Sequence, residues 1–295
     1  MTGRSVLYDV PGPRARRRNV GYTVAFGLAA AAIAWFVVSR LEDKGQLTTA
    51  MWGPFLEPST WTGYLLPGLR TTVTAAVLAI VLALPIGAVF GVARLSDHRW
   101  IRVPAGALVE LFRAVPVLVL MLFADFYYAY YTGVDSDVRP LFSVVVGLVL
   151  YNGSVLAEVF RAGITALPAG QSEASFALGL RKAQVMVSIL LPQAVAVMLP
   201  AIISQLVVVV KDTALGGVIL SFPDLMSNYR IVPANFQNVI PSLIVVGLIY
   251  VVLNGVLSWV ASALQGWLAH RRGGGPELAA VTAATDIVAA HSDSL

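Results

Sequence analysis

The sequence predicts an all-α, polytopic membrane protein of about six transmembrane helices. Of its 295 residues, 58% are hydrophobic and only 12% are charged, whereas a soluble domain carries about 25% charged residues. The apolar residues are also grouped in runs of roughly 20 or more, the length at which a helix crosses a bilayer. With no cysteine and three scattered histidines, the sequence offers neither a disulfide framework nor a cluster of metal ligands.

Six apolar runs are expected to span the membrane. They cover residues 20–39, 69–93, 104–131, 140–162, 185–210 and 240–268. The first follows a basic segment, residues 1–19, as in a signal peptide or a signal anchor. We favour an uncleaved anchor, because the run is long and Ser39–Asp43 makes a poor cleavage site.

The remaining segments divide the chain further. Residues 40–68 carry Trp52 and Trp61 and are expected at the outer interface, where tryptophan is enriched. Residues 69–272 form the expected membrane core, with a cytoplasmic loop near 163–184. The tail, residues 273–295, is rich in Gly, Ala and Ser without an apolar period, which predicts disorder.

The positions of Lys and Arg predict the orientation. With residues 1–19 in the cytoplasm, the inner segments carry thirteen Lys and Arg and the outer segments five. Since positively charged loops stay inside, both termini and the loop near 163–184 are expected to be cytoplasmic. The net charge of +4 is therefore a topology signal, and no nucleic-acid partner is expected.

A polar, cationic stretch at residues 173–192 separates two long apolar segments. Pro168 suits the first turn of a short helix, and Gly179 is expected to end that helix before a second begins. Ala174 allows close backbone approach, and an exposed Phe176 can enter a groove of a partner. The pattern predicts a docking loop on the cytoplasmic side.

No Gly-x-x-x-x-Gly-Lys-Ser/Thr phosphate-binding loop occurs in the sequence. We therefore expect no ATP site, no cofactor and no enzymatic activity in this chain. If ATP drives its function, another polypeptide binds the nucleotide.

The docking loop resembles the loop by which membrane subunits of ABC importers contact their ATPase. Glu173-Ala174-Ser175 is followed by Gly179 and then by Ile189-Leu190-Leu191-Pro192 in the family's spacing, with Ser175 where an alanine is usual. Three other segments are similar to motifs of the polar amino acid permeases of type I ABC importers: Phe112–Leu118, Glu158–Ile164 and Lys211–Leu215. Ala114-Val115 departs from the Gly-Thr of the first motif. The resemblance covers roughly residues 69–268.

This resemblance implies a five-helix importer core with one extra N-terminal helix. It also implies import of a polar amino acid, with glutamate or a close relative expected from a weaker match in the N-terminal extension and the long C-terminal tail. The implied partners are ABC ATPase subunits, an extracytoplasmic substrate-binding protein, and a second permease subunit that is either a copy of this chain or a relative. The implied ATPase-coupling residues are Gly170, Gln171, Glu173, Ala174, Phe176, Gly179, Leu191 and Pro192.

Ionisable residues at membrane depth are costly and usually face an interior. Glu110 and Arg113 are spaced i, i+3, as are Glu158 and Arg161, so each couple can pair on one helix face. We interpret both couples as structural ion pairs. Asp125 is a further carboxylate within the spans.

The fifth span supplies the candidate substrate pathway. It is expected to be kinked by its prolines, and its polar residues are Ser204, Gln205, Lys211, Asp212 and Thr213. A buried amide such as Gln205 needs a partner, either another helix or substrate. Lys211 and Asp212 are expected at the outer end of the span, as a gate, a receptor contact or a solvated helix end.

Two other classes of protein were weighed. An ion- or proton-coupled secondary amino acid transporter would need a relay of intramembrane carboxylates and often an internal repeat, and the sequence shows no repeat. A membrane enzyme would need a nucleophile–base or metal cluster, and none is evident. The secondary transporter remains the alternative.

Overall fold

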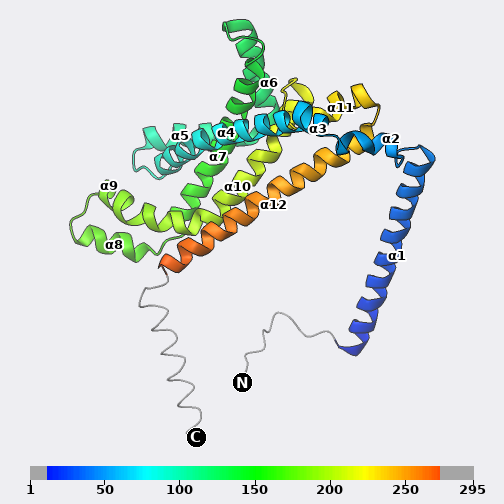
Figure 1. Cartoon of the computed structure of the whole chain (residues 1–295). Helices are drawn as coiled ribbons and strands as arrows, with labels where there is room; N and C mark the ends of the chain where they lie inside the picture. The colour runs from blue at the N-terminus through cyan, green and yellow to red at the C-terminus, as the bar shows by residue number, and fades with distance from the viewer. Residues whose placement is uncertain (1–11, 273–295) are drawn as a thin grey trace.

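The computed structural model of the chain describes residues 12–272, and all regular secondary structure in that range is helical (Figure 1). The main helices are α1 (Pro13–Asp43), α4 (Leu66–Ala93), α5 (Arg99–Ala114), α6 (Val117–Tyr131), α7 (Arg139–Thr165), α10 (Leu191–Ile219) and α12 (Val239–Arg272). Shorter elements are α2 (Thr49–Trp52), η1 (Gly53–Leu56), α3 (Pro58–Thr60), η2 (Trp61–Leu65), α8 (Ala169–Ala177), α9 (Lys182–Val185), η3 (Met186–Leu190) and α11 (Asn228–Phe236).

Helices α4 and α7 pack more extensively than any other pair among the described residues. Small residues recur at every fourth position of α4, on the face that α7 covers, and all are buried: Ala75, Ala79, Ala83, Gly87 and Gly91. A Cβ on Gly87 would lie 2.6 Å from the Leu156 Cβ, and one on Gly91 would lie 2.6 Å from the Phe160 Cβ. The Gly87–Gly91 pair therefore serves tight helix packing, as the small-xxx-small spacing predicts.

The expected span at 104–131 is present as a bent pair of helices, a bend that the sequence analysis did not predict. It is divided into α5 and α6, which meet at about 100°, and α6 projects from the rest of the bundle (Figure 1). Val115 has extended backbone angles of φ −85° and ψ 128°, because a residue before proline is disfavoured in the α region. Pro116 thus ends α5 and caps α6.

The fifth span also differs from its predicted limits of 185–210. The apolar segment long enough to cross a membrane is Val197–Ile219 within α10. Lys211, Asp212 and Thr213 consequently lie inside this helix rather than at its outer end. Their polar side chains did not end the helix, since Ala214–Ile219 continues the apolar pattern.

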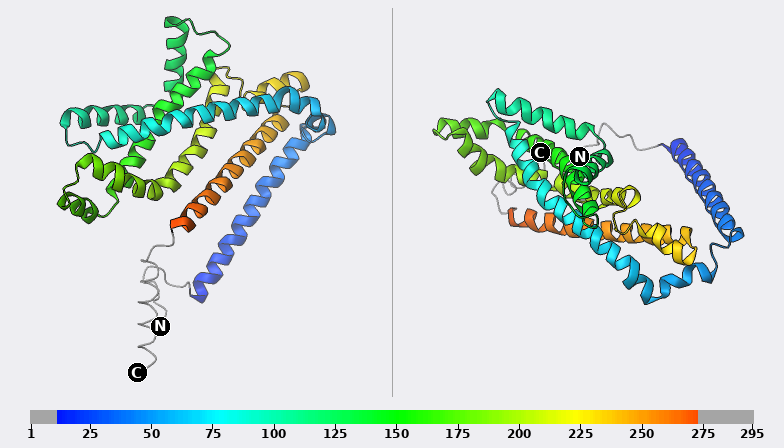
Figure 2. Two further views of the ribbon diagram at one scale, coloured as in Figure 1. Left: turned by 60° about the vertical axis from the view of Figure 1, so that its left-hand side comes forward. Right: turned by 90° about the horizontal axis from the view of Figure 1, so that it is seen from above.

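Helix α1 stands apart from the bundle (Figure 2) and has no buried residue. It begins at Pro13, so Arg14, Arg16, Arg17 and Arg18 lie in its first turns. Residues 1–11 and the predicted tail at 273–295 are outside the described range. Counting the bent α5–α6 pair as one span, residues 12–272 contain up to six helices able to cross a membrane. The all-α, six-span prediction is confirmed.

The segment predicted at the outer interface folds into the short helices α2 to η2. Both indoles are anchored, because the Trp52 Nε1 donates to the Gln46 carbonyl at 2.9 Å and the Trp61 Nε1 donates to the Phe55 carbonyl at 2.8 Å. Phe55 and Leu65 pack with residues of α11 and α12 in a separate apolar cluster. This end of the bundle is therefore capped by packed helices.

Candidate functional site

The predicted docking loop is a helix–turn–helix formed by α8 and α9. Pro168 is the N-cap of α8, one residue before its first turn. At the other end, the Gly179 N–H donates to the Phe176 carbonyl at 2.9 Å and the Leu180 N–H donates to the Ser175 carbonyl at 3.1 Å. This pair of bonds is a Schellman motif, which needs a left-handed residue at its centre, and Gly179 has φ +81°.

The side chains of α8 divide into an outward and an inward set. Glu173, Ala174 and Phe176 are exposed, with Phe176 keeping 48% of its surface. Ser175 points inward, where it is buried and donates its hydroxyl to the Gln171 carbonyl at 2.6 Å. The serine that departs from the family pattern is therefore satisfied within the helix, and the docking face stays small and apolar around one carboxylate.

The other predicted coupling residues occupy different environments. Gly170 is exposed with open space around its Cα, while the Oε1 atom of Gln171 is buried without a hydrogen-bond partner in the described part of the chain. Leu191 packs against the apolar cluster between α4, α7 and α10. Pro192 lies in the first turn of α10. Leu191 and Pro192 thus belong to the root of α10 rather than to the exposed face of α8.

A contact absent from the sequence analysis fastens this loop to the end of α4. The Lys182 ammonium pairs with the Asp97 carboxylate and donates to the Leu95 carbonyl at 3.0 Å. The hydrogen bond from Lys182 lowers the pKa of Asp97. A groove of about 340 Å³ runs beneath α8, lined by Leu95, Phe176 and Lys182 among others.

Within the membrane segment, the Gln205 amide has a protein partner. Its Nε2 lies 2.5 Å from the Oδ1 of Asn152, which is fully buried on α7 and donates its own amide to the Leu148 carbonyl. Ser204 is exposed and donates to the Pro200 carbonyl. The helix contact considered for Gln205 is therefore formed, with Asn152 of α7 as the partner.

The remaining candidate pathway residues lie further along α10. Lys211 is exposed, Asp212 is half-buried, and Thr213 is fully buried, with its hydroxyl donating to the Val210 carbonyl at 2.8 Å. The three residues therefore point in different directions around α10, and they are not gathered in one cavity.

The two predicted ion-pair couples are brought together into one cluster. The Arg113 guanidinium lies 3.5 Å from the Glu110 carboxylate, and the Arg161 guanidinium lies 2.5 Å from the Glu158 carboxylate. Arg94, at the end of α4, joins them by donating to Glu158 at 2.8 Å and to Glu110 at 3.0 Å. Three arginines and two glutamates thus connect α4, α5 and α7.

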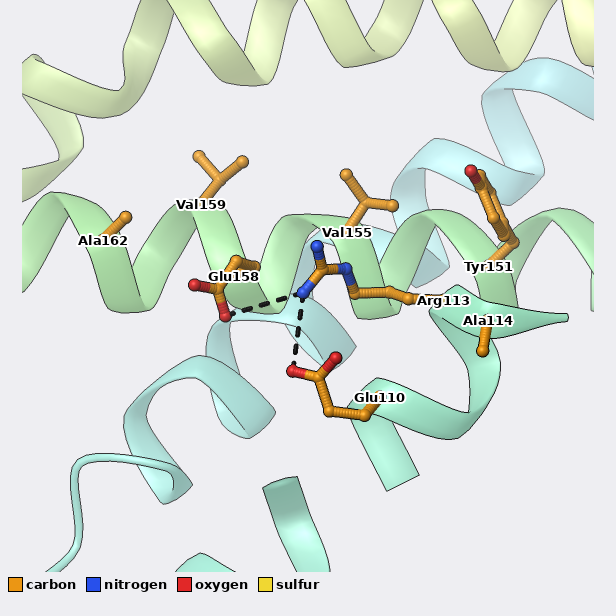
Figure 3. A pocket seen from close by; sticks show the side chains of 8 residues that line it. All are labelled: Glu110, Arg113, Ala114, Tyr151, Val155, Glu158, Val159 and Ala162. Carbon is orange, nitrogen blue, oxygen red and sulfur yellow. Dashed lines mark ion pairs between the residues drawn. The ribbon is translucent and has the colours of Figure 1, made fainter. Parts of the chain in front are cut away.

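This cluster borders a cavity of about 480 Å³ between the end of α5 and one face of α7 (Figure 3). The residues of α7 that line it are Tyr151, Val155, Glu158, Val159 and Ala162, and α5 contributes Glu110, Arg113 and Ala114. The break at Val115 allows this arrangement, because α5 ends beside α7 and α6 then leaves at a steep angle.

Sequence reasoning missed Arg94, Asp97, Asn152 and Asp224. Asp224 is fully buried between α10 and α11, accepting from the Ser227 N–H at 2.9 Å and from the Tyr250 hydroxyl at 3.1 Å. Burial raises the pKa of Asp224 to about 6. The partners that tie these residues to other elements, namely Glu158, Lys182, Gln205 and Tyr250, are distant in sequence, so no local spacing identifies them. Within residues 12–272 no group of three or more His, Cys, Asp or Glu side chains is placed to hold a metal ion.

Comparison with known proteins also indicates a membrane subunit of a transport system. Residues 79–273 match the family described as "Binding-protein-dependent transport system inner membrane component". The chain is 46% identical over 225 residues to the glutamate transport system permease protein GluD of Corynebacterium glutamicum, covering 76% of this chain and 82% of that protein. It is 31% identical over 205 residues to the arginine transport system permease protein ArtQ of Bacillus subtilis, covering 68% and 91%.

Solved structures give a matching result. A crystal structure described as an amino acid ABC transporter with histidines superposes with a TM-score of 0.64 at 26% sequence identity. The superposition covers 72% of this chain and 97% of the other.

Proposed function

The chain belongs to the binding-protein-dependent transport system inner membrane components, and on that premise we propose that it imports an acidic amino acid, glutamate or a close relative, using ATP hydrolysed by a partner subunit. The observation that carries the coupling is the exposed face of α8, where Glu173, Ala174 and Phe176 lie just before the Schellman turn at Gly179. The substrate class is supported by the 46% identity to a glutamate permease.

The architecture supports transmission of force from α8 into the membrane. The ammonium of Lys182 ties the loop to the carboxylate and carbonyl at the end of α4, and Leu191 roots α10 in the apolar cluster shared with α4 and α7. A displacement of α8 by an ATPase would therefore move the ends of α4 and α10 together. Movement of these helices would open the pathway alternately to the two sides of the membrane.

The expected partners and orientation complete this proposal. The thirteen-to-five distribution of Lys and Arg favours cytoplasmic termini and a cytoplasmic α8 in the cell membrane. ABC ATPase subunits would dock on α8, and an extracytoplasmic binding protein would deliver substrate to the opposite face. A second permease subunit, identical or related, would complete the pathway.

The secondary-transporter alternative has less support from the side-chain geometry. Its candidate relay carboxylates are Glu110, Asp125 and Glu158, and each is paired with an arginine. Asp125 accepts from the Arg139 guanidinium at 3.1 Å and from the Ser143 hydroxyl at 3.1 Å. Carboxylates that are already committed to ion pairs with arginines are less available as relay groups than free carboxylates would be.

The experiment is uptake of labelled glutamate into proteoliposomes that contain the assembled complex with its ATPase and binding protein. Glu173→Lys and Gly179→Leu should abolish ATP-dependent uptake while the chain still inserts, because the first reverses the docking charge and the second strains a φ of +81°. Gly106→Ala is the control, since a Cβ there meets nothing within 4 Å. Uptake that survives both changes with the ATPase still bound would exclude α8 as the coupling element.

A further inference from the structure

A second cavity lies between the first turns of α4 and the start of α7. This part of α4 is at the end of the bundle opposite to α8 and α9 (Figure 1). The cavity volume is about 620 Å³, within the range of small-molecule sites, roughly 300–1,000 Å³. Its walls are three threonines, two leucines and a proline, and Arg70 is the one charged residue among the described residues that line it.

The Arg70 guanidinium has no protein counter-ion in the described part of the chain. Its side chain is exposed, and no Asp or Glu of residues 12–272 forms an ion pair with it. The hydroxyls of Thr62, Thr71 and Thr74 already donate to carbonyls of the preceding helix turn, at 2.8 to 3.1 Å. The guanidinium is therefore the uncommitted donor of the cavity, and a charge beside a membrane is costly unless it meets water or an anion.

The position of Arg70 along its helix places it at the level of the lipid headgroups. Helix α4 belongs to an apolar span that ends at Ala93, 23 residues after Arg70. At a rise of roughly 1.5 Å per residue these residues cover about 35 Å, slightly more than the hydrocarbon thickness of about 30 Å. An arginine at this depth keeps its methylene groups along apolar surface while its guanidinium reaches the phosphate layer.

The chemistry of the cavity matches a phosphodiester. A guanidinium presents paired donors that fit two phosphate oxygens, and Leu66, Pro67 and Leu141 give apolar walls for the glycerol and the first acyl carbons. One positive charge balances one phosphate. A zwitterionic headgroup would bring its own cation, and the described lining offers no carboxylate to pair with it.

We propose that Arg70 and the cavity around it bind the phosphate of an anionic phospholipid, on the side of the membrane opposite to the docking loop. The site goes beyond the import function and does not depend on which substrate is carried. Arg70 lies outside residues 79–273, the part that matches the family, so the site is a feature of this chain. A lipid held there would pack between the ends of α4 and α7, which form the most extensive helix contact among the described residues.

The test is a titration of the purified permease–ATPase complex in detergent with phosphatidylglycerol or phosphatidylcholine, followed by native mass spectrometry. Arg70→Gln should weaken phosphatidylglycerol binding at the tightest site by about tenfold, the effect of losing one charge-assisted hydrogen bond. Binding of phosphatidylcholine should not change. Arg70→Lys keeps the charge but loses the paired donors, so it should give an intermediate affinity.

Arg40→Gln is the matched control, because Arg40 is exposed at the same end of the molecule but lies 3.8 Å from the Asp43 carboxylate. Equal weakening by Arg40→Gln and Arg70→Gln would overturn the proposal, as would wild-type affinity in the Arg70→Gln complex. Competition identifies the source of the anion. Inorganic phosphate or glutamate that displaces the lipid at millimolar concentration would assign the cavity to a free anion and contradict a lipid site, whereas retention of the lipid supports it.

Discussion

Two polar sites at opposite ends of the bundle, one partly exposed and one fully buried, stabilise the fold by different means. Around Glu158, charge is balanced by charge: arginines from α4, α5 and α7 surround a carboxylate whose side chain is 26% exposed. Around Asp224, the carboxylate is fully buried and accepts from neutral donors, among them the Ser227 N–H and the Tyr250 hydroxyl. No Lys or Arg of the described range forms an ion pair with Asp224.

The comparison teaches which end of the bundle can rearrange. Ion pairs that reach solvent can exchange partners and water at small cost, because much of their interaction is screened. A dry carboxylate held by neutral donors cannot move without leaving polar groups unpaired. We therefore expect the Asp224 end to be rigid and the Glu158 end to adapt during transport.

The largest effect on stability is expected at Gly217, whose backbone lies very close to the Asp224 side chain. A Cβ on Gly217 would lie 2.7 Å from the Asp224 Cγ and closer still to Oδ1. Gly217→Ala should lower the free energy of unfolding by about 4 kcal/mol, from overpacking and broken hydrogen bonds. Gly247→Ala is the matched control, because its Cβ meets nothing within 4 Å. Equal unfolding midpoints for the two variants in detergent would contradict the rigid site.

A pH effect of intermediate size is expected from the same carboxyl. Burial raises the pKa of Asp224 from 3.8 to about 6, so the folded protein binds the proton more tightly than the unfolded chain. The resulting stability is fully present below about pH 4 and is lost as pH rises through about 6, with a total of about 3 kcal/mol.

Asp224→Asn, which keeps a neutral side chain of similar shape, should remove this dependence. The measurement is the difference in unfolding free energy between wild type and variant at pH 4, 5, 6 and 7. A difference that does not change across this range would show that Asp224 titrates normally.

The smallest effect is expected in the charge cluster. Arg94→Gln removes two hydrogen-bonded ion pairs, but Arg113 and Arg161 remain beside Glu158. The free energy of unfolding should fall by about 2 kcal/mol at low salt. This decrease in unfolding free energy should be smaller at about 0.5 M salt, because salt at that concentration screens partly exposed charges.

Arg99→Gln is the control for this measurement, because Arg99 is an exposed arginine at the start of α5. The Gly217→Ala defect should be insensitive to salt. If salt reduced the destabilisation of Arg94→Gln and of Gly217→Ala equally, the distinction between the charge-balanced Glu158 site and the fully buried Asp224 site would be wrong.

Features that depend on neighbouring residues could be predicted from the sequence. The turn at Gly179 needs only a left-handed residue after a short helix, and the i, i+3 couples Glu110–Arg113 and Glu158–Arg161 need only a helix. The spacing of Gly87 and Gly91 predicts that another helix approaches α4 closely, whereas only the structure identifies that helix as α7.

Features that depend on distant residues could not be predicted. Gln205 meets Asn152 across 53 positions, and Arg94 meets Glu158 across 64, so no spacing rule connects them. The span expected at 104–131 is present as the bent pair α5–α6, but the apolar run alone did not indicate the bend of about 100° at Val115–Pro116.

Composition and local pattern determined by themselves that this chain is a helical membrane protein, because apolar length and charge asymmetry are local properties, and the importer family was identified from the resemblance of its short motifs. Only the tertiary structure decided that three arginines and two glutamates share one cavity, that α5 ends beside α7, and that Asp224 is buried without a cation. The physical reason is that charge balance and burial depend on groups that folding brings together. These neighbours are distant in sequence, so local sequence patterns do not identify them.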